Sequence, residues 1–281
     1  MLLSYDWLNE FIDLKCKPQE VAHTLTMAGL EIESVDASGE DGVTFEVNVT
    51  PNRGDCLSVL GVARELSAVK GIPLTMPPLS PVITHKDSTG GFTVSIDNED
   101  MCYRYMARVI RGIRVEKSPQ WLERKLRACG VRSISNIVDI TNYVLFELGH
   151  PMHAFDIDKL EGNLIRVGEA MQDSIKVKTL DGIEREVPRG TLLIWDAVKP
   201  VAVAGVIGTK DTEVSGATTS ILLESAWFEP SLIRTASKRL GIKTESSYRF
   251  ERSTDILNVK MALDRATFLI HELCGGESYC E

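Results

Sequence analysis

The sequence predicts an α+β protein: a small N-terminal α/β module (residues 1–75), a linker (76–91) and a larger mixed α+β domain (92–281) with mainly antiparallel sheets. Some segments repeat apolar residues at helical spacing, whereas many shorter segments alternate apolar and polar residues. Between them lies a stretch rich in proline that ends in Ser-Thr-Gly-Gly, a composition typical of linkers. A length of 281 residues also favours a large and a small domain over a single one.

The N-terminal module is predicted to contain helices and a pair of strands. Residues 2–12 are amphipathic and predict a first helix, and residues 18–28 predict a second that ends at Gly29. Residues 30–35 and 45–49 alternate in polarity and predict two paired strands, joined by a polar turn at residues 38–42.

A turn rich in polar residues, 50–56, precedes a predicted helix at residues 57–70. Asp55 is placed to begin that helix. Arg53, Arg64 and Glu65 form a candidate polar cluster at its start, and we favour a structural role for it, as a capped turn, over a functional one.

The larger domain is predicted to open with strands at 92–96 and 104–113 and a helix from Ser118 to Cys129. This helix and the residues after it concentrate positive charge on an otherwise acidic protein. A solvated face is the favoured interpretation, and contact with an RNA backbone is the alternative. The basic residues are Arg124, Lys125, Arg127 and Arg132.

Residues 137–156 contain the densest group of polar side chains within apolar sequence. Residues 137–148 predict a helix that carries Thr141 and Asn142, and Gly149 and Pro151 end it. A turn is expected to present His150 and His153. These residues alone allow two interpretations: a polar turn whose groups are satisfied by backbone hydrogen bonds, or a functional site.

Five further strands are predicted at residues 164–167, 175–179, 183–187, 192–196 and 200–206, with a hairpin turn at 179–182. Residues 202–208 are small and apolar, and their glycines allow either close approach to a ligand or tight internal packing.

Residues 220–227 predict an apolar strand that carries Glu224. A carboxylate there must be hydrogen-bonded, paired or neutral, and we favour a specificity group for a hydroxyl or amine over a buried ion pair. A helix at 230–240 containing Lys238 and Arg239, a polar loop at 241–252 and a helix at 256–273 complete the chain.

Composition limits the classes of function. The net charge of −9 argues against broad, nonspecific binding of nucleic acid. No apolar run reaches membrane-spanning length and no secretion signal is present, so we expect a cytoplasmic protein. The cysteines contain no CxxC pair, which favours reduced thiols over disulfides or a zinc site. They are Cys16, Cys56, Cys102, Cys129, Cys274 and Cys280.

Seven motifs, in order along the chain, resemble the bacterial phenylalanyl-tRNA synthetase beta chain. They are Met27-Ala-Gly-Leu-Glu31, Thr50-Pro-Asn-Arg-Gly-Asp-Cys-Leu57, Gly61-Val-Ala-Arg-Glu-Leu66, Thr141-Asn-Tyr-Val144, Gly149-His-Pro-Met-His-Ala-Phe-Asp156, Leu223-Glu-Ser-Ala226 and Ser247-Tyr-Arg-Phe-Glu-Arg252.

The chain departs from that family in two ways. The family carries a tRNA-binding insertion where residues 38–42 form a short turn, and it continues past residue 281 into modules that pack on the alpha chain. The chain therefore resembles the N-terminal module joined to the editing domain. An artificial shortening at the turn is favoured over a naturally short relative.

The resemblance implies hydrolytic proofreading. The synthetase makes Phe-tRNA in its alpha chain with ATP and Mg, and the beta-chain editing domain hydrolyses mischarged Tyr-tRNA(Phe). Glu224 would accept a hydrogen bond from the tyrosine phenol. His153 and Asn142 would hold the ester and a water, with Thr141 beside them. The expected pocket wall and substrate contacts are Ala204, Gly205, Gly208, Pro151 and Met152.

The expected partners are the acceptor end of tRNA(Phe) and the synthetase alpha chain. Candidate RNA contacts are Arg124, Lys125, Arg132, Lys238 and Arg239. No metal site or cofactor is expected in this part, since an activated ester needs only a positioned water. His153 as a general base and His153 as a positioning group both remain open. The rival interpretation is a non-catalytic RNA-binding or scaffolding module, inactive in isolation.

Overall fold

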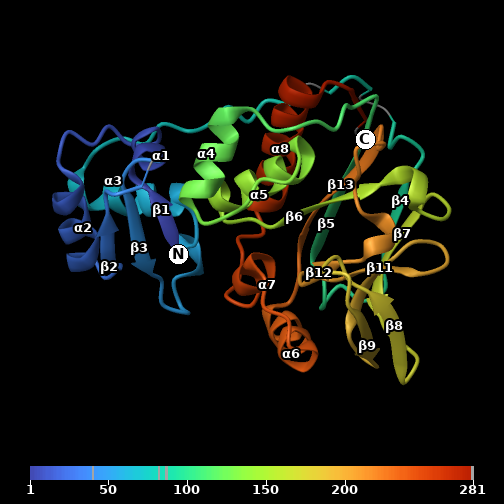
Figure 1. Ribbon diagram of the computed structural model, residues 1–281. Helices are drawn as coiled ribbons and strands as arrows, with labels where there is room; N and C mark the ends of the chain where they lie inside the picture. Colours follow the sequence, from blue (N-terminus) through green and yellow to red (C-terminus); the bar gives the residue numbers. More distant parts are fainter. Residues whose placement is uncertain (40, 82, 86–87, 280–281) are drawn as a thin grey trace.

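The computed structural model describes residues 1–39, 41–81, 83–85 and 88–279 (Figure 1). Glu40 of the predicted turn and Cys280 lie outside these residues. Among the described residues, no helix is both long and apolar enough to span a membrane. None of the five described cysteines is paired with another described cysteine in a disulfide.

The described residues form eight α-helices. They are α1 (Tyr5–Asn9), α2 (Pro18–Met27), α3 (Val59–Lys70), α4 (Gln120–Ala128), α5 (Asn136–Leu148), α6 (Pro230–Leu240), α7 (Glu245–Phe250) and α8 (Asn258–Cys274).

Fourteen strands accompany them in the same part of the chain. They are β1 (Leu2–Ser4), β2 (Glu31–Asp36), β3 (Thr44–Asn48), β4 (Thr93–Ile96), β5 (Arg104–Arg111), β6 (Met152–Asp156), β7 (Leu164–Glu169), β8 (Ser174–Lys178), β9 (Glu184–Pro188), β10 (Leu192–Trp195), β11 (Pro200–Val203), β12 (Ile207–Gly208), β13 (Ser220–Trp227) and β14 (Glu277–Tyr279).

The strands form four sheets, with orders β1-β3-β2, β12-β11-β10-β7-β4, β14-β5-β13-β6 and β8-β9. Within the described residues, the named strands pair antiparallel except β4 with β7, which pair in parallel. The predicted α+β class with mainly antiparallel sheets is confirmed.

The four-stranded and five-stranded sheets pack face to face, and α5 and α8 cover the outer face of the four-stranded sheet (Figure 1). Alternation along β13 produces this arrangement. Ile221 and Leu223 belong to the core beneath the helices, whereas Leu222 and Ala226 belong to the core between the sheets. A strand buried on both faces reads as a nearly continuous apolar run, which is what residues 220–227 show.

The N-terminal module shares its core with the larger domain. Trp7 of α1 stacks on Tyr143 of α5 with ring centroids 4.6 Å apart, and one hydrophobic core includes residues from α1, α3, α5 and α8. Residues 76–81 form neither helix nor strand. The predicted linker at 76–91 thus connects two segments that are packed together, and the domain boundaries themselves stay a prediction.

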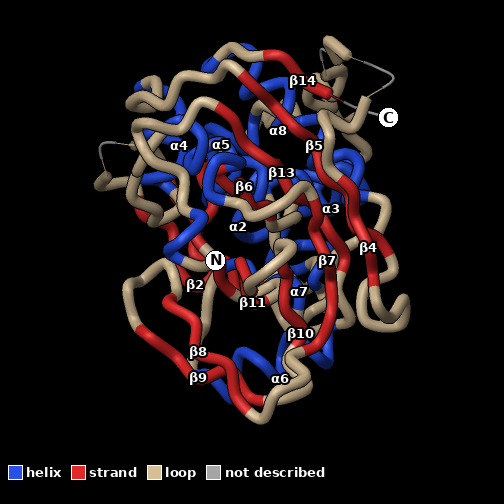
Figure 2. The backbone as a smooth tube through the Cα atoms, turned by 90° about the vertical axis from the view of Figure 1, so that its right-hand side faces the viewer, coloured by secondary structure: helices blue, strands red, loops and turns tan. Residues whose placement is uncertain are grey.

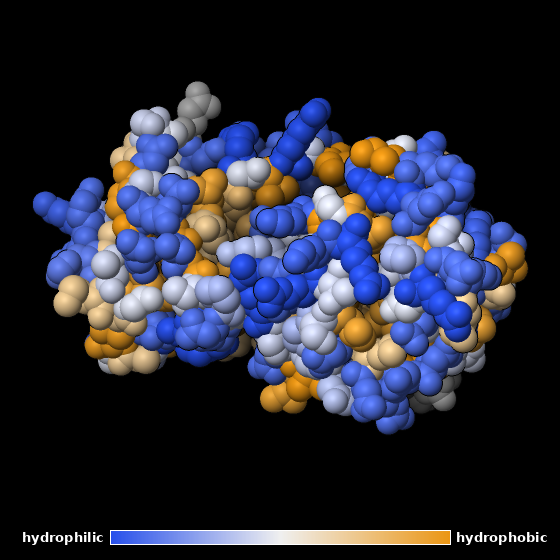
Figure 3. All heavy atoms as spheres, turned by 90° about the horizontal axis from the view of Figure 1, so that it is seen from below, coloured by the Kyte–Doolittle hydropathy of each residue, from blue (hydrophilic) through white to orange (hydrophobic). Residues whose placement is uncertain are grey.

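Two other views show the ends of the molecule. The β8–β9 hairpin and α6 lie together at one end (Figure 2). Seen from below, the surface is mostly hydrophilic and forms two lobes with a notch between them, the N-terminal module being the lobe on the left (Figure 3).

The structure corrects four local predictions, two of them at helix starts. Residues 2–4 form an edge strand instead of the first turn of a helix, because Leu3 pairs with Phe45. The helix predicted at 57–70 begins at Val59, and its cap is Ser58, whose Oγ accepts from the Gly61 N–H at 2.9 Å.

The other two corrections lie close to the candidate site. His153 lies on β6 instead of in a turn, because residues 152–156 pair with β13. The predicted polar loop at 241–252 contains α7, which starts with a reciprocal capping box between Thr244 and Ser247.

Candidate functional site

A cavity of about 200 Å³ lies where the two packed sheets meet α7. Chain segments far apart in sequence form it: the start of β6, the β11–β12 segment, the middle of β13 and the N-terminal part of α7 (Figure 1). It is lined by Pro151, Met152, His153, Leu180, Ala202, Val203, Gly205, Val206, Ile207, Gly208, Glu224, Thr244, Ser246 and Phe250.

Glu224 is the only carboxylate in this lining. It occupies the same face of β13 as Leu222 and Ala226, so the strand's alternation directs it between the sheets, where it is 8% exposed. Burial raises the pKa of Glu224 to about 7, and a hydrogen bond from Tyr105 opposes the rise. The Tyr105 hydroxyl donates to Glu224 Oε2 at 2.6 Å.

His153 is the cross-strand partner of Glu224 in the β6–β13 register. Its Nε2 is buried and has no hydrogen-bond partner among the described residues, and its ring packs edge-on against Phe155 at 4.5 Å between centroids. Burial lowers the pKa of His153 to about 4. The imidazole is therefore neutral at physiological pH, able to donate or accept a hydrogen bond but a weak proton acceptor.

Two glycines are required by close packing in the wall. A Cβ at Gly208 would lie 2.6 Å from Cε1 and 2.7 Å from Nε2 of His153. Gly205 has φ +64°, and a Cβ there would lie 2.9 Å from Ile233 Cδ1 and 3.0 Å from Phe250 Cδ2. Glycine at these positions lets the backbone approach the histidine ring and turn sharply beside the cavity.

The start of α7 fixes this glycine-containing wall. Thr244 Oγ1 donates to the carbonyl of Val206 at 2.8 Å, and Ser246 Oγ donates to the carbonyl of Gly205 at 3.2 Å. Sequence reasoning missed both residues because it interpreted 241–252 as a loop. The available signal was a threonine three residues before Ser247, the spacing of an N-terminal cap.

The structure brings together six of the nine catalytic and substrate-binding candidates. Pro151, Met152, His153, Gly205, Gly208 and Glu224 all line the cavity, while Ala204 is buried beside it.

Thr141 and Asn142 are not among the lining residues. Both lie on α5, and the Thr141 hydroxyl donates to the carbonyl of Val138 at 2.7 Å. Their predicted contact with the ester stays a prediction.

The predicted RNA contacts fall on separate faces. Lys125 already has partners within the chain. Its Nζ lies 2.5 Å from Glu10 Oε2 and 5.2–5.5 Å from the ring centroids of Trp7, Trp121 and Tyr143. Arg124 and Lys125 both line one hollow beside α4. Arg132 lines a neighbouring hollow at the end of that helix.

Lys238 and Arg239 lie on α6 and line a broad hollow of about 680 Å³ together with Arg234. Because α6 packs against α7, whose first turn lines the cavity, this basic surface is next to the candidate site.

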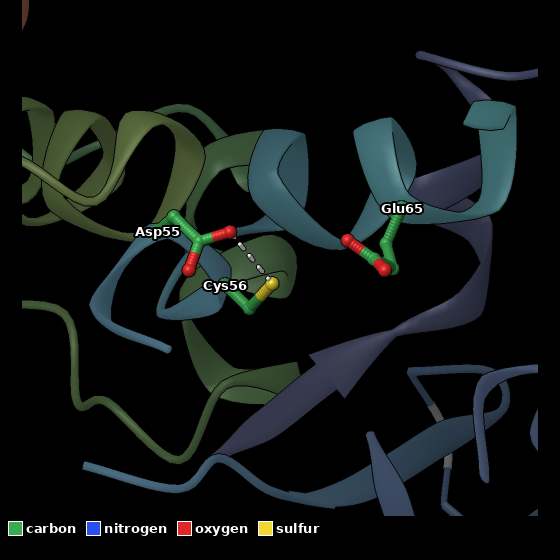
Figure 4. Close-up of side chains that lie close together, drawn as sticks. All are labelled: Asp55, Cys56 and Glu65. Atoms are coloured by element: carbon green, nitrogen blue, oxygen red, sulfur yellow. Dashed lines mark hydrogen bonds between the residues drawn. The ribbon is translucent and has the colours of Figure 1, made fainter. Parts of the chain in front are cut away.

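One group of side chains in the described part of the chain has metal-ligand chemistry: Asp55, Cys56 and Glu65 (Figure 4). The group already contains a cation, because Arg53 Nη2 lies 2.9 Å from Asp55, 2.7 Å from Glu65 and 2.8 Å from Cys56 Sγ. Burial raises the pKa of the Cys56 thiol to about 12, so it is not a thiolate. These observations favour an internal ion pair. The sequence predicted a turn capped by Asp55 and held by an arginine pair, whereas the described contacts of this cluster come from Arg53 and the helix cap is Ser58.

Comparison with known proteins identifies the family. The B3/4 domain family model matches residues 101–275. The phenylalanine–tRNA ligase beta subunit of Geobacter sulfurreducens is 49% identical over 88% of the chain, and that of Moorella thermoacetica is 48% identical over 87%. The matches cover 31% and 30% of those relatives, so the chain spans about a third of their length.

Relatives differ in their internal length. The beta subunit of Fusobacterium nucleatum aligns at 40% identity over 282 residues, 97% of this chain and 35% of its own, and therefore crosses residues 38–42 without a long insertion. The alignment with Syntrophotalea carbinolica extends over 392 residues, so that relative has residues within the alignment that this chain lacks. A short connection thus also occurs in a natural relative.

A solved N-terminal fragment of the phenylalanyl-tRNA synthetase beta subunit from Pyrococcus horikoshii covers 99% of this chain and 75% of its own, at 16% identity and a TM-score of 0.49.

Proposed function

Since this chain belongs to the B3/4 domain family and is similar over most of its length to phenylalanine–tRNA ligase beta subunits, we propose that it is an editing module that hydrolyses Tyr-tRNA(Phe). The observation that carries the proposal is Glu224, a buried carboxylate in the wall of an otherwise largely apolar cavity. Tyrosine and phenylalanine differ by one hydroxyl, and a site built to hydrogen-bond that hydroxyl discriminates strongly.

The size of the cavity supports an amino-acid ligand. Its volume of about 200 Å³ is below the roughly 300–1,000 Å³ typical of pockets for drug-sized ligands. It suits one aminoacyl group, with the rest of the tRNA outside. In the proposed complex the tyrosine phenol donates a hydrogen bond to Glu224, and the ester carbonyl lies toward His153.

The proposed reaction adds water to the ester carbonyl carbon and breaks its bond to the terminal ribose oxygen, which takes a proton. Free tyrosine and uncharged tRNA leave. A histidine whose pKa is about 4 is a poor general base at neutral pH. We therefore assign His153 a positioning role, holding the ester or the attacking water through a neutral imidazole. Neither ATP nor a metal ion enters this step.

The proposed route for the RNA crosses α6. Lys238 and Arg239 offer positive charge next to the cavity, whereas Lys125 is already paired. We propose tRNA(Phe) as the substrate, the synthetase alpha chain as the partner, and the cytoplasm, where tRNA is charged, as the location.

The alternative is a binding or scaffolding module without activity of its own. It is favoured by one fact: the chain spans about a third of the length of its relatives. If tRNA binding needs further contacts, the remaining two thirds of those relatives are where such contacts would lie. The experiment below separates the two.

The test measures deacylation of preformed Tyr-tRNA(Phe) and Phe-tRNA(Phe) by this chain. We expect loss of tyrosine at least tenfold faster than loss of phenylalanine, and we expect His153→Ala to abolish the difference. Gly208→Ala should reduce the rate strongly, because its Cβ would displace the His153 ring.

The matched control is Gly216→Ala, where a Cβ would meet nothing within 4 Å, and it should behave as the wild type. Equal rates for the two esters, or no rate above spontaneous hydrolysis at high protein concentration, would favour the scaffolding alternative.

A further inference from the structure

We propose that Tyr105 is a positioning residue for Glu224: its phenol fixes one carboxylate oxygen, leaves the other to the ligand, and thereby sets how strongly the cavity selects a hydroxyl. This inference rests on the proposed function, because it concerns the same carboxylate. Tyr105 belongs to none of the motifs that indicated the family and was not a candidate from sequence.

The geometry follows from the register of two neighbouring strands. Glu224 on β13 is opposite Ala107 on β5, and Tyr105 is two residues along β5, opposite Ala226. The two side chains are diagonal neighbours on one face, a separation that an aromatic side chain spans. The small side chains of Ala107 and Ala226 leave room for the phenol to reach Glu224 Oε2, at 2.6 Å.

Tyr105 is the sole hydrogen-bond donor to Glu224 within the described part of the chain. A buried carboxylate bound by a single donor has free acceptor capacity. Because that donor holds Oε2, the remaining capacity is directed at the cavity that Glu224 lines. A ligand phenol then binds as a second donor to a carboxylate that is already fixed.

Two other titratable groups lie next to Glu224 on neighbouring segments, and neither brings a positive charge. His153 on β6 is neutral because burial lowers its pKa to about 4. Cys102, which precedes β5, has a thiol pKa raised to about 12 by burial and by Glu224. On the far face of β13, Ser225 donates to the carbonyl of Val259 on α8.

The Tyr105 hydroxyl is consequently the one group that favours the charged form of Glu224 against burial. Removing it should leave a carboxyl that is mostly protonated at neutral pH. A protonated carboxyl is a weaker acceptor for a phenol than a carboxylate. The structure therefore links Tyr105 to the pH dependence of amino-acid selection, an effect that a purely structural tyrosine would not produce.

The test compares Tyr105→Phe with Tyr103→Phe in the full chain. Tyr103 is 55% exposed and packs on Trp227, so it is a control for loss of a hydroxyl near the same strand. Carbon-13 NMR of the Glu224 side-chain carboxyl gives its titration midpoint directly. We expect a midpoint near pH 7 in the wild type and in Tyr103→Phe, and about one pH unit higher in Tyr105→Phe.

Deacylation measured between pH 6.5 and 8.5 provides the functional readout. Tyr105→Phe should lose about fivefold of the tyrosine-over-phenylalanine preference at pH 7, because the ionised fraction of Glu224 falls by that factor, and recover most of it at pH 8.5. Tyr103→Phe should follow the wild-type profile throughout. An unchanged carboxyl midpoint in Tyr105→Phe would overturn the inference, whatever the rates.

Two outcomes separate this inference from the proposed function. If the wild type hydrolyses neither ester, the proposed function fails, while the NMR midpoints still decide whether Tyr105 controls Glu224. If Tyr105→Phe does not fold, fluorotyrosine at position 105 replaces it, since a more acidic phenol is a stronger donor. The midpoint should then move below that of the wild type, and no movement would overturn the inference.

Discussion

Two polar clusters of this protein differ in whether the chain itself supplies their partners. Around Arg53, each carboxylate has a cationic partner: the guanidinium contacts Asp55 and Glu65 directly. In the cavity, the part of the chain that the structure describes offers Glu224 a single neutral donor and His153 Nε2 no hydrogen-bond partner. The first cluster is complete within the chain, whereas the second lacks partners beside an open volume of about 200 Å³.

The contrast separates polar groups whose charge is balanced inside the fold from polar groups that lack a partner beside a cavity. In the Arg53 cluster the guanidinium balances both carboxylates, and such charge-assisted contacts contribute to stability. A buried group without sufficient partners costs free energy, and a protein that retains it does so at the expense of stability.

Glu224→Ala should lower the preference for tyrosine over phenylalanine esters by about a hundredfold, roughly 2.8 kcal/mol, because the cavity loses its acceptor for the phenol. Deacylation rates for the two tRNA esters measure it. The control from the other cluster is Glu65→Ala, which should weaken the fold and leave the preference unchanged. A mutant of Glu224 with full preference would show that another group contacts the hydroxyl.

Glu224→Gln should stabilise the fold at pH 8. The pKa of Glu224 is raised in the folded state, to about 7, so its favourable contribution is present below its ordinary pKa and is lost as pH rises through 7. The charged form therefore costs about 2–3 kcal/mol at pH 8 relative to pH 5. Urea unfolding at both pH values checks this. A glutamine variant whose gain does not grow with pH would contradict it.

Arg53→Met should destabilise the fold by about 1–2 kcal/mol, because Asp55 and Glu65 lose their shared donor at sites that are only partly exposed. Lys15→Met is the matched control: its ion pair with Asp13 is largely exposed, so its loss should cost under about 0.5 kcal/mol. Denaturant unfolding measures both. Arg53→Met should leave the ester preference intact, and a loss of preference would break the contrast between the clusters.

Lys238→Gln and Arg239→Gln should each slow deacylation about threefold at low salt, with the amino-acid preference unchanged. Phosphate contacts hold the RNA without reading the amino acid, and their effect should fade as salt increases. The rate as a function of salt concentration measures this, with Lys15→Gln as a distant control. Identical salt dependence in all variants would show that Lys238 and Arg239 of α6 do not contact the RNA.

Local sequence was sufficient where an element is determined by its own residues. Helix 230–240 and strand 220–227 have the predicted bounds, since a proline start with a glycine stop and a long apolar run are local signals. The turn at 179–182 also forms as predicted, and Thr179 N–H donates to the carbonyl of Ile183 at 3.0 Å.

Elements determined by distant pairing were missed. Strand β1 exists because residues 2–4 pair with residues 44–46, and His153 is on a strand because β6 pairs with β13. Thr141 and Asn142, assigned to the site by the family resemblance, lie on α5 and are not among the residues that line the cavity, so their contact with the ester stays a prediction.

The family and the α+β class could be predicted from the amino-acid sequence, because motifs, periodicity and turn residues are local properties. Only the tertiary structure decided which groups meet. Tyr105 and Glu224 are 119 positions apart, and strand register places them 2.6 Å from each other. The pKa values near 7 for Glu224 and 4 for His153 follow from burial between the two sheets. Burial results from packing segments that are distant in sequence, so it cannot be predicted from any one of them.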